Sequence, residues 1–560
     1  METERPNAGV EQTEDVASLI GRTPSAYGYP LLIKHLLHTP LAYAPEQEIV
    51  YRDVKRYDYR TLRQRIGQLA SGLEDLGVEP GNTVAVMDWD SHRYLECYFG
   101  VPMMGAVLQT VNVRLSPDQI LYTINHAESD VLLVHADFLP ILEEIEDRFE
   151  TEKKVVLLTD EDERPETSVD FGAEYEELVE SGSADYDFPD FDENTRATTF
   201  HTTGTTGNPK GVYFSHRQLV LHTLAGLAGL SMSATQGRFH NADVYMPITP
   251  MFHVHAWGKP YMATVMGVKQ VYPGQYDPEI LLDLIEKEKV TMSHCVPTIL
   301  HMLLGSAEDR DIDLKGWKVV IGGSPLPESM ARRALDLGID VFVGYGQSET
   351  CPLVTLAQLT PEMLERDPDE QVEIRTKTGR PIPLVDLRIV DEETNDVPRD
   401  GSSTGEVVVR APWLTQGYLK EPEKSEELWE DGYLHTEDIG YIDPEGYLQV
   451  TDRIKDVIKT GGEWVSSQEI EDILLQHPGV HEAAVIGVED EKWGERPLAL
   501  VVPSQDEVTE DGVSSHVREY AEGGEISKYA VPDRVQFVEE IDKTSVGKID
   551  KKTLREKYAE

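Results

Sequence analysis

Ten consecutive residues carry a high density of groups that can bind phosphate. The segment Thr202–Gly211 reads TTGTTGNPKG and ends in a lysine and a glycine. Glycines let backbone N–H groups approach an anion, hydroxyls donate hydrogen bonds, and an ammonium supplies positive charge. No G-x-x-x-x-G-K-[ST] pattern passes through this lysine, so the segment is not a Walker loop. It predicts a phosphate-binding loop of another kind, with contacts from Thr202, Thr203, Gly204, Thr205, Thr206, Gly207 and Lys210.

Two further polar turns each follow a predicted strand. The strand Lys318–Ile321 runs into Gly322-Gly323-Ser324-Pro325, whose bare backbone can lie flat against a ring. The strand Val341–Val343 runs into Tyr345-Gly346-Gln347-Ser348-Glu349-Thr350, which adds an aromatic face, a hydroxyl and a carboxylate. Ligands of open parallel sheets gather at such carboxyl-end turns. The carboxylate suits Mg²⁺, although a solvated acid at a helix start is the plain alternative.

Together these segments resemble the superfamily of AMP-forming adenylating enzymes, which includes acyl-CoA synthetases, adenylation domains of peptide synthetases and beetle luciferases. Its signature motifs stand in family order from about Tyr57 to Arg555, essentially the whole chain. The resemblance implies that adenine lies near the Gly322–Ser324 turn and packs on Tyr345. It also implies that Ser348, where the family commonly has threonine, contacts the α-phosphate. Magnesium would be bound by Glu349 with help from Thr202, and Gly346 and Gln347 complete this part of the nucleotide site.

The ribose contacts follow from a later motif. His435-Thr436-Glu437-Asp438 is similar to the family's T-G-D element, with Glu437 in place of the usual glycine. The resemblance implies that the carboxylate of Asp438 accepts from the ribose hydroxyls, as suits an acceptor-only group, and that Arg453 adds a second sugar contact. Lys455 matches the family's hinge position, and Lys459 follows it by one helical turn's spacing.

Two segments near the C-terminus complete the resemblance. Lys543-Thr544-Ser545-Val546-Gly547-Lys548 is similar to the motif P-K-T-x-x-G-K, with Asp542 in the proline position. The resemblance implies that Lys548 stabilises charge developing during adenylation, and that Lys210 assists at the phosphates. In relatives, the segment matching Gly461-Gly462-Glu463-Trp464 forms part of the pantetheine tunnel, which makes Gly462, Glu463 and Trp464 candidate contacts to coenzyme A.

One stretch of the sequence indicates which kind of carboxylic acid the protein would activate. Met251–Pro260, reading MFHVHAWGKP, together with KTGGEWVSS at 459–467, is most similar to the branch that activates medium- and long-chain fatty acids. By this resemblance His253 lies near the reacting carboxylate and Trp257 lines or closes the acyl tunnel, since an indole is large and apolar. His255 stands where that branch often has asparagine. A core histidine and a core tryptophan remain the alternatives.

The elements that must position these residues are those of an α/β protein. Apolar runs at Thr83–Met87, Val131–Val134 and Val155–Leu158 alternate with helical segments, which is typical of parallel α/β layers. After about Pro352 the pattern changes to strands separated by turns. The resemblance adds detail: two α/β subdomains and a β-barrel form a large N-terminal portion, followed by a small mobile α+β domain. We therefore expect an adenylation portion over residues 1–452, β-rich from about 352, and a mobile domain over 453–560.

The amino-acid composition argues against some classes of binding partner. The 560 residues include 102 acidic and 51 basic ones, a formal charge of −51 that argues against nucleic acids and anionic membranes as partners. No apolar run reaches the roughly 18 residues of a membrane span, and the acidic N-terminus is unlike a signal peptide, so we expect a cytoplasmic protein. A high-salt cytoplasm would explain the acidity, the alternative being an acidic protein without salt adaptation. The three cysteines are far apart and predict buried positions.

The predicted activity is ATP-dependent formation of acyl-CoA from a fatty-type acid, with Mg²⁺, through an acyl adenylate. No carrier domain follows Glu560, so free coenzyme A is the expected thiol. A rival within the superfamily would load a carrier protein or prefer an aryl or short-chain acid. A rival of another class is a catalytically silent nucleotide-binding protein. Relatives in this branch are often dimers, which makes a homodimer an implied state.

Overall fold

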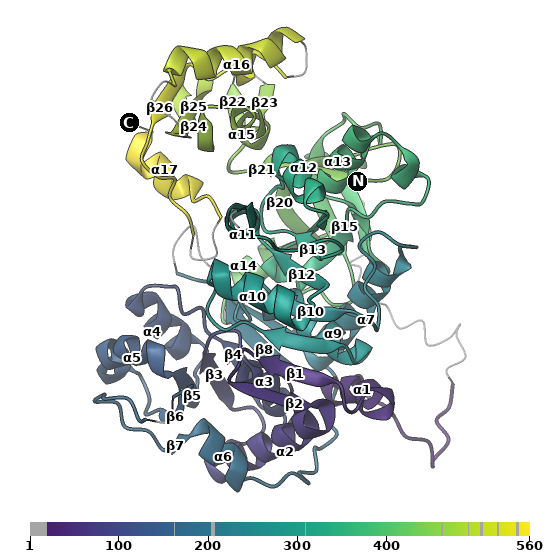
Figure 1. Ribbon diagram of the computed structural model, residues 1–560, viewed down its shortest axis with the longest axis vertical. Coiled ribbons are helices and arrows are strands. Elements are labelled where there is room, and N and C mark those ends of the chain that lie inside the picture. The colour runs from purple at the N-terminus through teal and green to yellow at the C-terminus, as the bar shows by residue number, and fades with distance from the viewer. Residues whose placement is uncertain are drawn as a thin grey trace, which may run out of the picture.

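A twisted, mostly parallel sheet forms one end of the N-terminal portion (Figure 1). The structure is a computed structural model that describes residues 20–161, 163–202, 208–308, 310–460, 463–490, 492–504, 508–523, 526–544 and 548–559. Only the last pair of strands in this sheet is antiparallel. Its order is β7 (Ala173–Glu174), β6 (Lys154–Leu158), β5 (Val131–His135), β3 (Thr83–Met87), β4 (Val107–Thr110), β8 (Arg196–His201) and β9 (Gly211–Ser215). The predicted strands at 83–87, 131–134 and 155–158 are thereby confirmed.

A second sheet lies beside the first and carries the two predicted glycine-bearing turns. Its order is β16 (Arg380–Pro381), β15 (Leu353–Leu356), β14 (Asp340–Gly346), β13 (Lys318–Ile321), β12 (Met292–Cys295), β10 (Val244–Pro247), β11 (Lys269–Tyr272), β1 (Glu48–Tyr51) and β2 (Lys55–Asp58). The central strands β10 to β14 are parallel, and their side chains are almost all buried, as sheets covered on both faces require. The predicted strand at 318–321 has the bounds of β13.

Helices cover these sheets, and most begin at recognisable caps. The predicted helix at Pro278 is α10, whose first N–H groups donate to the Asp277 carboxylate. The helices of this portion are α1 (His38–Tyr43), α2 (Tyr59–Asp75), α3 (His92–Met103), α4 (Pro117–His126), α5 (Leu139–Ile145), α6 (Tyr175–Ser181), α7 (His216–Met232), α8 (Val254–Trp257), α9 (Lys259–Met266), α10 (Pro278–Glu288), α11 (Pro297–Glu308), α12 (Glu328–Asp336) and α13 (Pro368–Thr376). All three cysteines are buried and unpaired, as predicted.

The β-rich region after Pro352 contains an antiparallel sheet of its own. It comprises β17 (Asp386–Val390), β18 (Gly405–Arg410), β19 (Trp429–Glu430), β20 (Tyr433–Ile442) and β21 (Leu448–Arg453), with α14 (Pro422–Glu427) at its edge. Strands β20 and β21 run antiparallel and place Asp438 opposite Arg453. These two predicted ribose contacts are therefore neighbours in one ladder.

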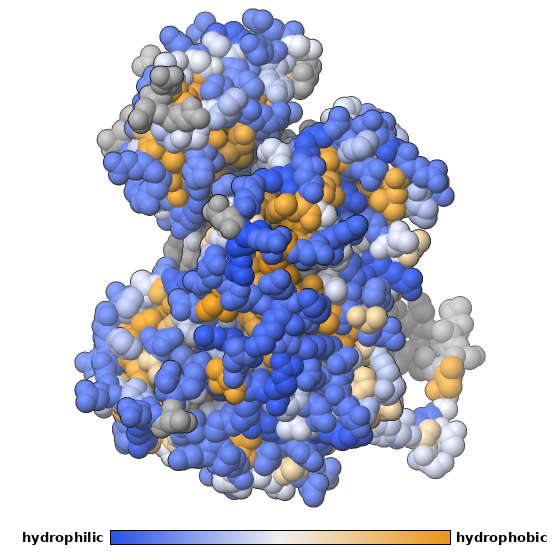
Figure 2. All heavy atoms as spheres, in the orientation of Figure 1, coloured by the Kyte–Doolittle hydropathy of each residue, from blue (hydrophilic) through white to orange (hydrophobic). Residues whose placement is uncertain are grey.

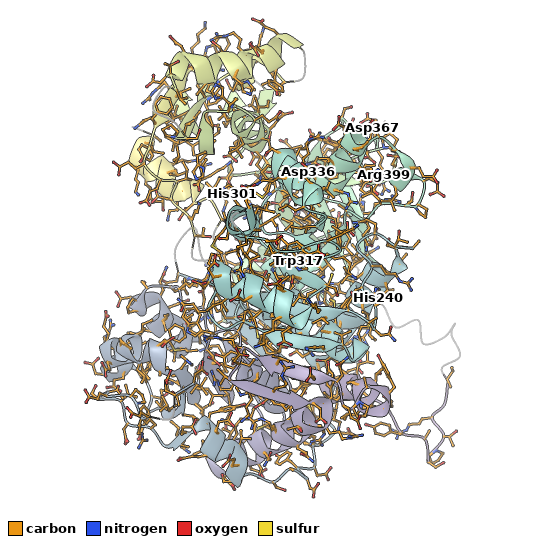
Figure 3. The ribbon with its side chains drawn as sticks, viewed as in Figure 1. His240, His301, Trp317, Asp336, Asp367 and Arg399 are labelled. Carbon is orange, nitrogen blue, oxygen red and sulfur yellow. The ribbon has the colours of Figure 1, made fainter. Side chains whose placement is uncertain are left out.

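The chain beyond β21 forms a separate smaller lobe, coloured yellow-green to yellow in Figure 1. Its sheet contains β22 (Ile458–Thr460), β23 (Glu463–Val465), β24 (Val480–Asp490), β25 (Gly494–Pro503) and β26 (Arg534–Phe537), packed with α15 (Ser467–Leu475), α16 (Glu510–Gly523) and α17 (Lys551–Tyr558). His301 of α11 lies on the side of the larger portion that faces this lobe (Figure 3), and its ring centroid is 5.6 Å from that of His481. The expected class, a large α/β portion followed by a small α+β domain, is confirmed.

The surface is dominated by hydrophilic residues on the face drawn in Figure 2. None of the helices in the described part of the chain combines the length and apolar character that a bilayer crossing requires. Large exposed hydrophobic side chains are scattered over several elements, among them Leu224, Met232 and Leu384.

Candidate active site

The neck of the threonine-glycine loop is closed by two hydrogen bonds between Thr202 and Lys210. The Thr202 N–H donates to the Lys210 carbonyl at 2.9 Å, and the Lys210 N–H donates to the Thr202 hydroxyl at 3.2 Å. These two bonds close the end of the β8–β9 hairpin. The predicted contacts Thr203, Gly204, Thr205, Thr206 and Gly207 lie outside the described residues.

The turn after β13 has no room for side chains. A Cβ added to Gly322 would lie 2.7 Å from the Gly344 carbonyl oxygen and 3.0 Å from the Trp257 ring. Gly323 has a φ of +83°, which favours glycine, and a Cβ there would lie 3.3 Å from Cε of Lys548. Ser324 continues the turn. Backbone, an indole and a lysine from the other lobe thus meet at this point, which the sequence predicted only as a flat platform.

The predicted ribose residues form one hydrogen-bonded cluster with the predicted adenine residue. Asp438 accepts from the Tyr345 hydroxyl at 2.6 Å and from the Gln347 side-chain amide at 2.8 Å, and Arg453 lies 3.2 Å from its other oxygen. Asp438 raises the pKa of Arg453, and burial together with Asp438 raises the pKa of Tyr345 well above its usual value. Gly346 completes the strand end, where a Cβ would meet the Pro352 carbonyl. A carboxylate held by three donors in this way is oriented before any ligand arrives.

Glu349 is the middle residue of a short 3-10 helix, Ser348–Thr350, which begins immediately after Gln347. One of its carboxylate oxygens accepts from the Tyr418 hydroxyl at 2.9 Å. The ammonium of Lys210 lies 4.4 Å from the centre of the same tyrosine ring, within cation–π range. Tyr418 therefore joins the neck of the phosphate loop to the predicted metal ligand.

The donor set at Glu349 fits Mg²⁺. Within the described residues, no group of three or more His, Cys, Asp or Glu side chains is placed to hold a metal ion. A site with one carboxylate and a nearby hydroxyl matches the habit of Mg²⁺, which binds through one or two carboxylates and completes its shell with phosphate oxygens and water. Glu349 would supply the carboxylate, and the hydroxyl that lies beside it is that of Tyr418, while a contribution from Thr202 stays a prediction.

Among the described residues of the smaller lobe, Lys548 is the predicted site residue that lies in this cluster. Its Cε lies against Gly323, and its charge interacts with Arg453, Asp438 and Glu349. Burial lowers the pKa of its ammonium to about 8, with a further lowering by Arg453 and opposing effects of Asp438 and Glu349. An ammonium from the smaller lobe thus lies among the residues that are predicted to bind the nucleotide.

His253 and Trp257 flank the same region. Burial, followed by the charge of Lys548, lowers the pKa of His253 to about 3, so its imidazole is neutral at physiological pH. Trp257 is buried with 7% exposure, and its ring centroid is 5.1 Å from that of His294. The residues between them turn in a left-handed sense: Val254, His255, Ala256 and Trp257 have φ of 47°, 54°, 47° and 58°. Each such residue costs about 1–2 kcal/mol, so this segment is strained.

The remaining predicted residues lie at the junction of the two lobes. Lys455 follows the end of β21, and Lys459 lies in β22, where its N–H donates to Glu495 at 2.8 Å and it pairs with Trp464 across the hairpin. Gly462 and the side chains of Glu463 and Trp464 lie outside the described residues. The hinge and coenzyme A roles of this segment stay predictions.

Two neighbours of the cluster were not predicted from the sequence. Tyr418 follows Gly417 and lies 69 positions after Glu349 in the chain. No feature of a single sequence indicates that these two residues are in contact. Lys259 was read only as part of the segment around Trp257, yet its ammonium is buried and has no hydrogen-bond partner among the described residues. A lysine inside an apolar run was the available signal for Lys259.

Comparison with known proteins agrees with this geometry. The model of the AMP-binding enzyme family matches residues 38–419, and that of the AMP-binding enzyme C-terminal domain matches residues 469–548. A long-chain-fatty-acid–CoA ligase of Thermus thermophilus is 41% identical over 91% of this chain and 93% of its own, and a medium-chain-fatty-acid–CoA ligase of Ectopseudomonas oleovorans is 36% identical over 95% and 96%. The ATP-bound crystal structure of MatB from Rhodopseudomonas palustris superposes with a TM-score of 0.80 at 25% identity, covering 95% of this chain and 99% of that one.

The fold and the cluster are those of a two-lobed nucleotide-binding enzyme. The chain belongs to the AMP-binding enzyme family, since the family model spans most of its larger portion and relatives above 30% identity cover nearly all of it.

Proposed function

We propose that the protein is an AMP-forming acyl-CoA synthetase, which converts a fatty acid, ATP and coenzyme A to acyl-CoA, AMP and pyrophosphate. The observation that carries the proposal is the meeting of Lys548 from the smaller lobe with Gly323, Glu349 and the Asp438–Arg453 pair. Its membership of the AMP-binding enzyme family and its fatty-acid–CoA ligase relatives support the same activity.

In the first step a carboxylate oxygen attacks the α-phosphorus of ATP and pyrophosphate leaves. The proposed roles follow from the cluster: Asp438 and Arg453 hold the ribose, Tyr345 packs on adenine at Gly322–Ser324, and Ser348 contacts the α-phosphate. The threonine-glycine loop, Lys210 and Lys548 neutralise the phosphates, so catalysis is positioning and charge stabilisation. Mg²⁺, held by Glu349 with Thr202, would neutralise phosphate charge. Neutral His253 can lie beside the acid without repelling Lys548.

In the second step the thiolate of coenzyme A attacks the acyl carbon and AMP leaves. Lys548 occupies the nucleotide cluster in the present arrangement, so the smaller lobe must turn before another of its surfaces reaches the adenylate. We place the hinge at Lys455 and assign Gly462, Glu463 and Trp464 to the pantetheine path, with Lys459 beside them.

The fatty acid assignment rests on the fatty-acid–CoA ligase relatives and on Trp257, an apolar ring placed directly beside the Gly322 turn. We also propose a high-salt cytoplasm as the setting, because the charge of −51 repels itself strongly at low ionic strength. A homodimer is proposed from the branch of the family alone.

The experiment is a panel of C2 to C18 acids, with aromatic acids included, assayed for AMP release in high KCl with and without coenzyme A. Acid-dependent AMP together with acyl-CoA is the expected result. Pyrophosphate release without acyl-CoA would favour a carrier-protein acceptor, and a preference for aryl or short acids would favour that alternative. Hydrolysis of ATP only to ADP and orthophosphate, whatever the acid, would refute the proposal.

A further inference from the structure

A buried amine without a partner lies next to Trp257 and has no role in the chemistry described above. Lys259 opens helix α9 and is 1% exposed. Its Nζ has no hydrogen-bond partner among the described residues. Lysine is almost never fully buried unless it is paired, and a helix N-terminus is unfavourable for a cation. An ammonium at this position therefore needs a hydrogen-bond acceptor that the described residues do not provide.

The groups around this amine belong to the neighbourhood of Trp257. Lys259 stands two residues after Trp257, and a Cβ added to the intervening Gly258 would lie 2.7 Å from the ring of His222. Burial, followed by the charge of Lys259, lowers the pKa of His294 well below its usual value. His294 packs against the ring of Trp257 at 5.1 Å and is 2.8 Å from the Tyr245 hydroxyl through Nε2. Its Nδ1, like Nζ of Lys259, is buried without a partner in the described structure. Two buried polar atoms without partners thus lie in the region of Trp257, one on the ring that packs against it and one on the residue two positions after it.

We expect the acyl chain of the substrate to run toward this region. The acid's carboxylate is expected beside His253 and Lys548, next to Gly323. The ring of Trp257 lies 3.0 Å from a Cβ built on Gly322, and its centroid is 5.1 Å from that of His294. A chain that leaves the carboxylate and passes the indole would therefore come near His294 and Lys259.

His255, also buried with both ring nitrogens unpartnered, is explained by packing. Its ring lies among the aromatic rings of Tyr98, Phe200 and Phe214, with centroids 5.3 to 6.2 Å away, and burial keeps it neutral by lowering its pKa to about 3. Aromatic edges and faces can surround a neutral imidazole. They cannot satisfy the three donors of an ammonium, so Lys259 is the residue that needs a ligand.

We infer that Lys259 is a specificity-determining residue that hydrogen-bonds an oxygen carried by the acyl chain beyond Trp257, so that oxygenated aliphatic acids are preferred over plain ones. The inference rests on the proposed function, because it names the class of acid that the same site activates. A site with a buried donor rejects an analogue that lacks the acceptor, since the donor is then left unpaired. A hydroxyl and a distal carboxylate share this acceptor chemistry.

The test compares acids of equal length from C4 to C12 in plain, ω-hydroxy and α,ω-dicarboxylic form, with purified full-length enzyme. For at least one length we expect kcat/KM of an oxygenated acid to exceed that of the plain acid by about tenfold or more. In Lys259→Met, which keeps the length and removes the amine, this ratio should fall by at least the same factor and turnover of the plain acid should rise. The better of the two oxygenated forms identifies the acceptor.

A second buried lysine supplies the matched control. Lys318 is 9% exposed but is paired with Asp243 at 2.5 Å, so Lys318→Met should leave the ratio of oxygenated to plain acid unchanged. Unfolding curves confirm that both variants are folded. A plain-acid preference at every length in the unmodified enzyme, or an equal effect of Lys259→Met on both kinds of acid, would overturn the inference alone. Absence of acyl-CoA with every acid would instead overturn the proposed function.

Discussion

Raising the pH should switch off the adenylation step by removing the proton from Lys548. Burial next to Gly323, with Arg453 nearby, lowers the pKa of this ammonium to about 8. A group with that pKa is about 90% protonated at pH 7 and about 10% protonated at pH 9. The neutral amine of Lys548 cannot stabilise phosphate charge as its ammonium form does. We therefore expect kcat/KM for ATP to fall by about tenfold between pH 7 and pH 9.

The assay is acid-dependent exchange of labelled pyrophosphate into ATP, measured at limiting ATP from pH 6.5 to 9.5 without coenzyme A. This readout isolates the first step. Lys548→Arg keeps a charge over the whole range, because the guanidinium pKa is above 12. Its rate should be lower but independent of pH, whereas Lys548→Ala should lose about 10²- to 10³-fold at pH 7.

The pH dependence of stability separates this loss from unfolding. The folded-state pKa of Lys548 lies below its unfolded value, so the protonated unfolded state is favoured at low pH. The resulting destabilisation is at most about 3 kcal/mol, is present below pH 8, and disappears as the pH rises toward 10.5. Deprotonation of Lys548 therefore stabilises the fold while it inactivates the enzyme. An alkaline fall of equal steepness in Lys548→Arg would show that another group titrates and would refute the assignment.

Three further outcomes are expected. Asp438→Ala should raise KM for ATP by about 10- to 100-fold, because it removes a carboxylate oriented by three donors, and steady-state kinetics at saturating acid will measure it. Lys259→Met should raise the free energy of unfolding at pH 7 by about 4 kcal/mol, because burial lowers the folded-state pKa of Lys259 to about 7, far below its unfolded value. Lys318→Met should lower the free energy of unfolding by about 3 kcal/mol, because it leaves Asp243 unpaired. Urea titrations will compare the two variants. The unfolding midpoint should rise between dilute buffer and molar KCl, and an unchanged midpoint would exclude salt adaptation.

The strands of the two large sheets could be predicted closely because they are buried on both faces. Continuous apolar runs mark such strands, and Thr83–Met87 and Lys318–Ile321 have the predicted bounds. The turn glycines were equally visible, since Gly323 adopts a positive φ that other residues avoid. A strand end and the turn that follows it are close in sequence. The part of the cluster that they contain could therefore be predicted from the sequence.

The rest of the cluster depends on contacts between distant segments. Tyr418 reaches Glu349 only because Gly211 and Leu419 pair across the β9 edge, where the Leu419 N–H donates to the Gly211 carbonyl at 2.7 Å. The left-handed turn at 254–257 contradicts every local preference of its side chains, so tertiary packing must hold it. Neither feature has a periodicity or composition that a single sequence displays.

We expect the junction between the lobes to couple nucleotide binding to lobe position. Arg453 ends β21 and contacts Asp438, while the adjacent Asp452 is buried and its carboxylate accepts from the N–H of Ser467, the first residue of α15, at 2.7 Å. A rotation about the hinge that we propose at Lys455 would keep Asp452 with the larger portion and carry Ser467 away. Such a turn would break this bond and the second one that the Ser467 hydroxyl donates to the same oxygen, at a cost of about 1–3 kcal/mol unless water or a new donor replaces Ser467. A cost of that size, one residue from the proposed ribose contact, would favour the arrangement with Lys548 in the site.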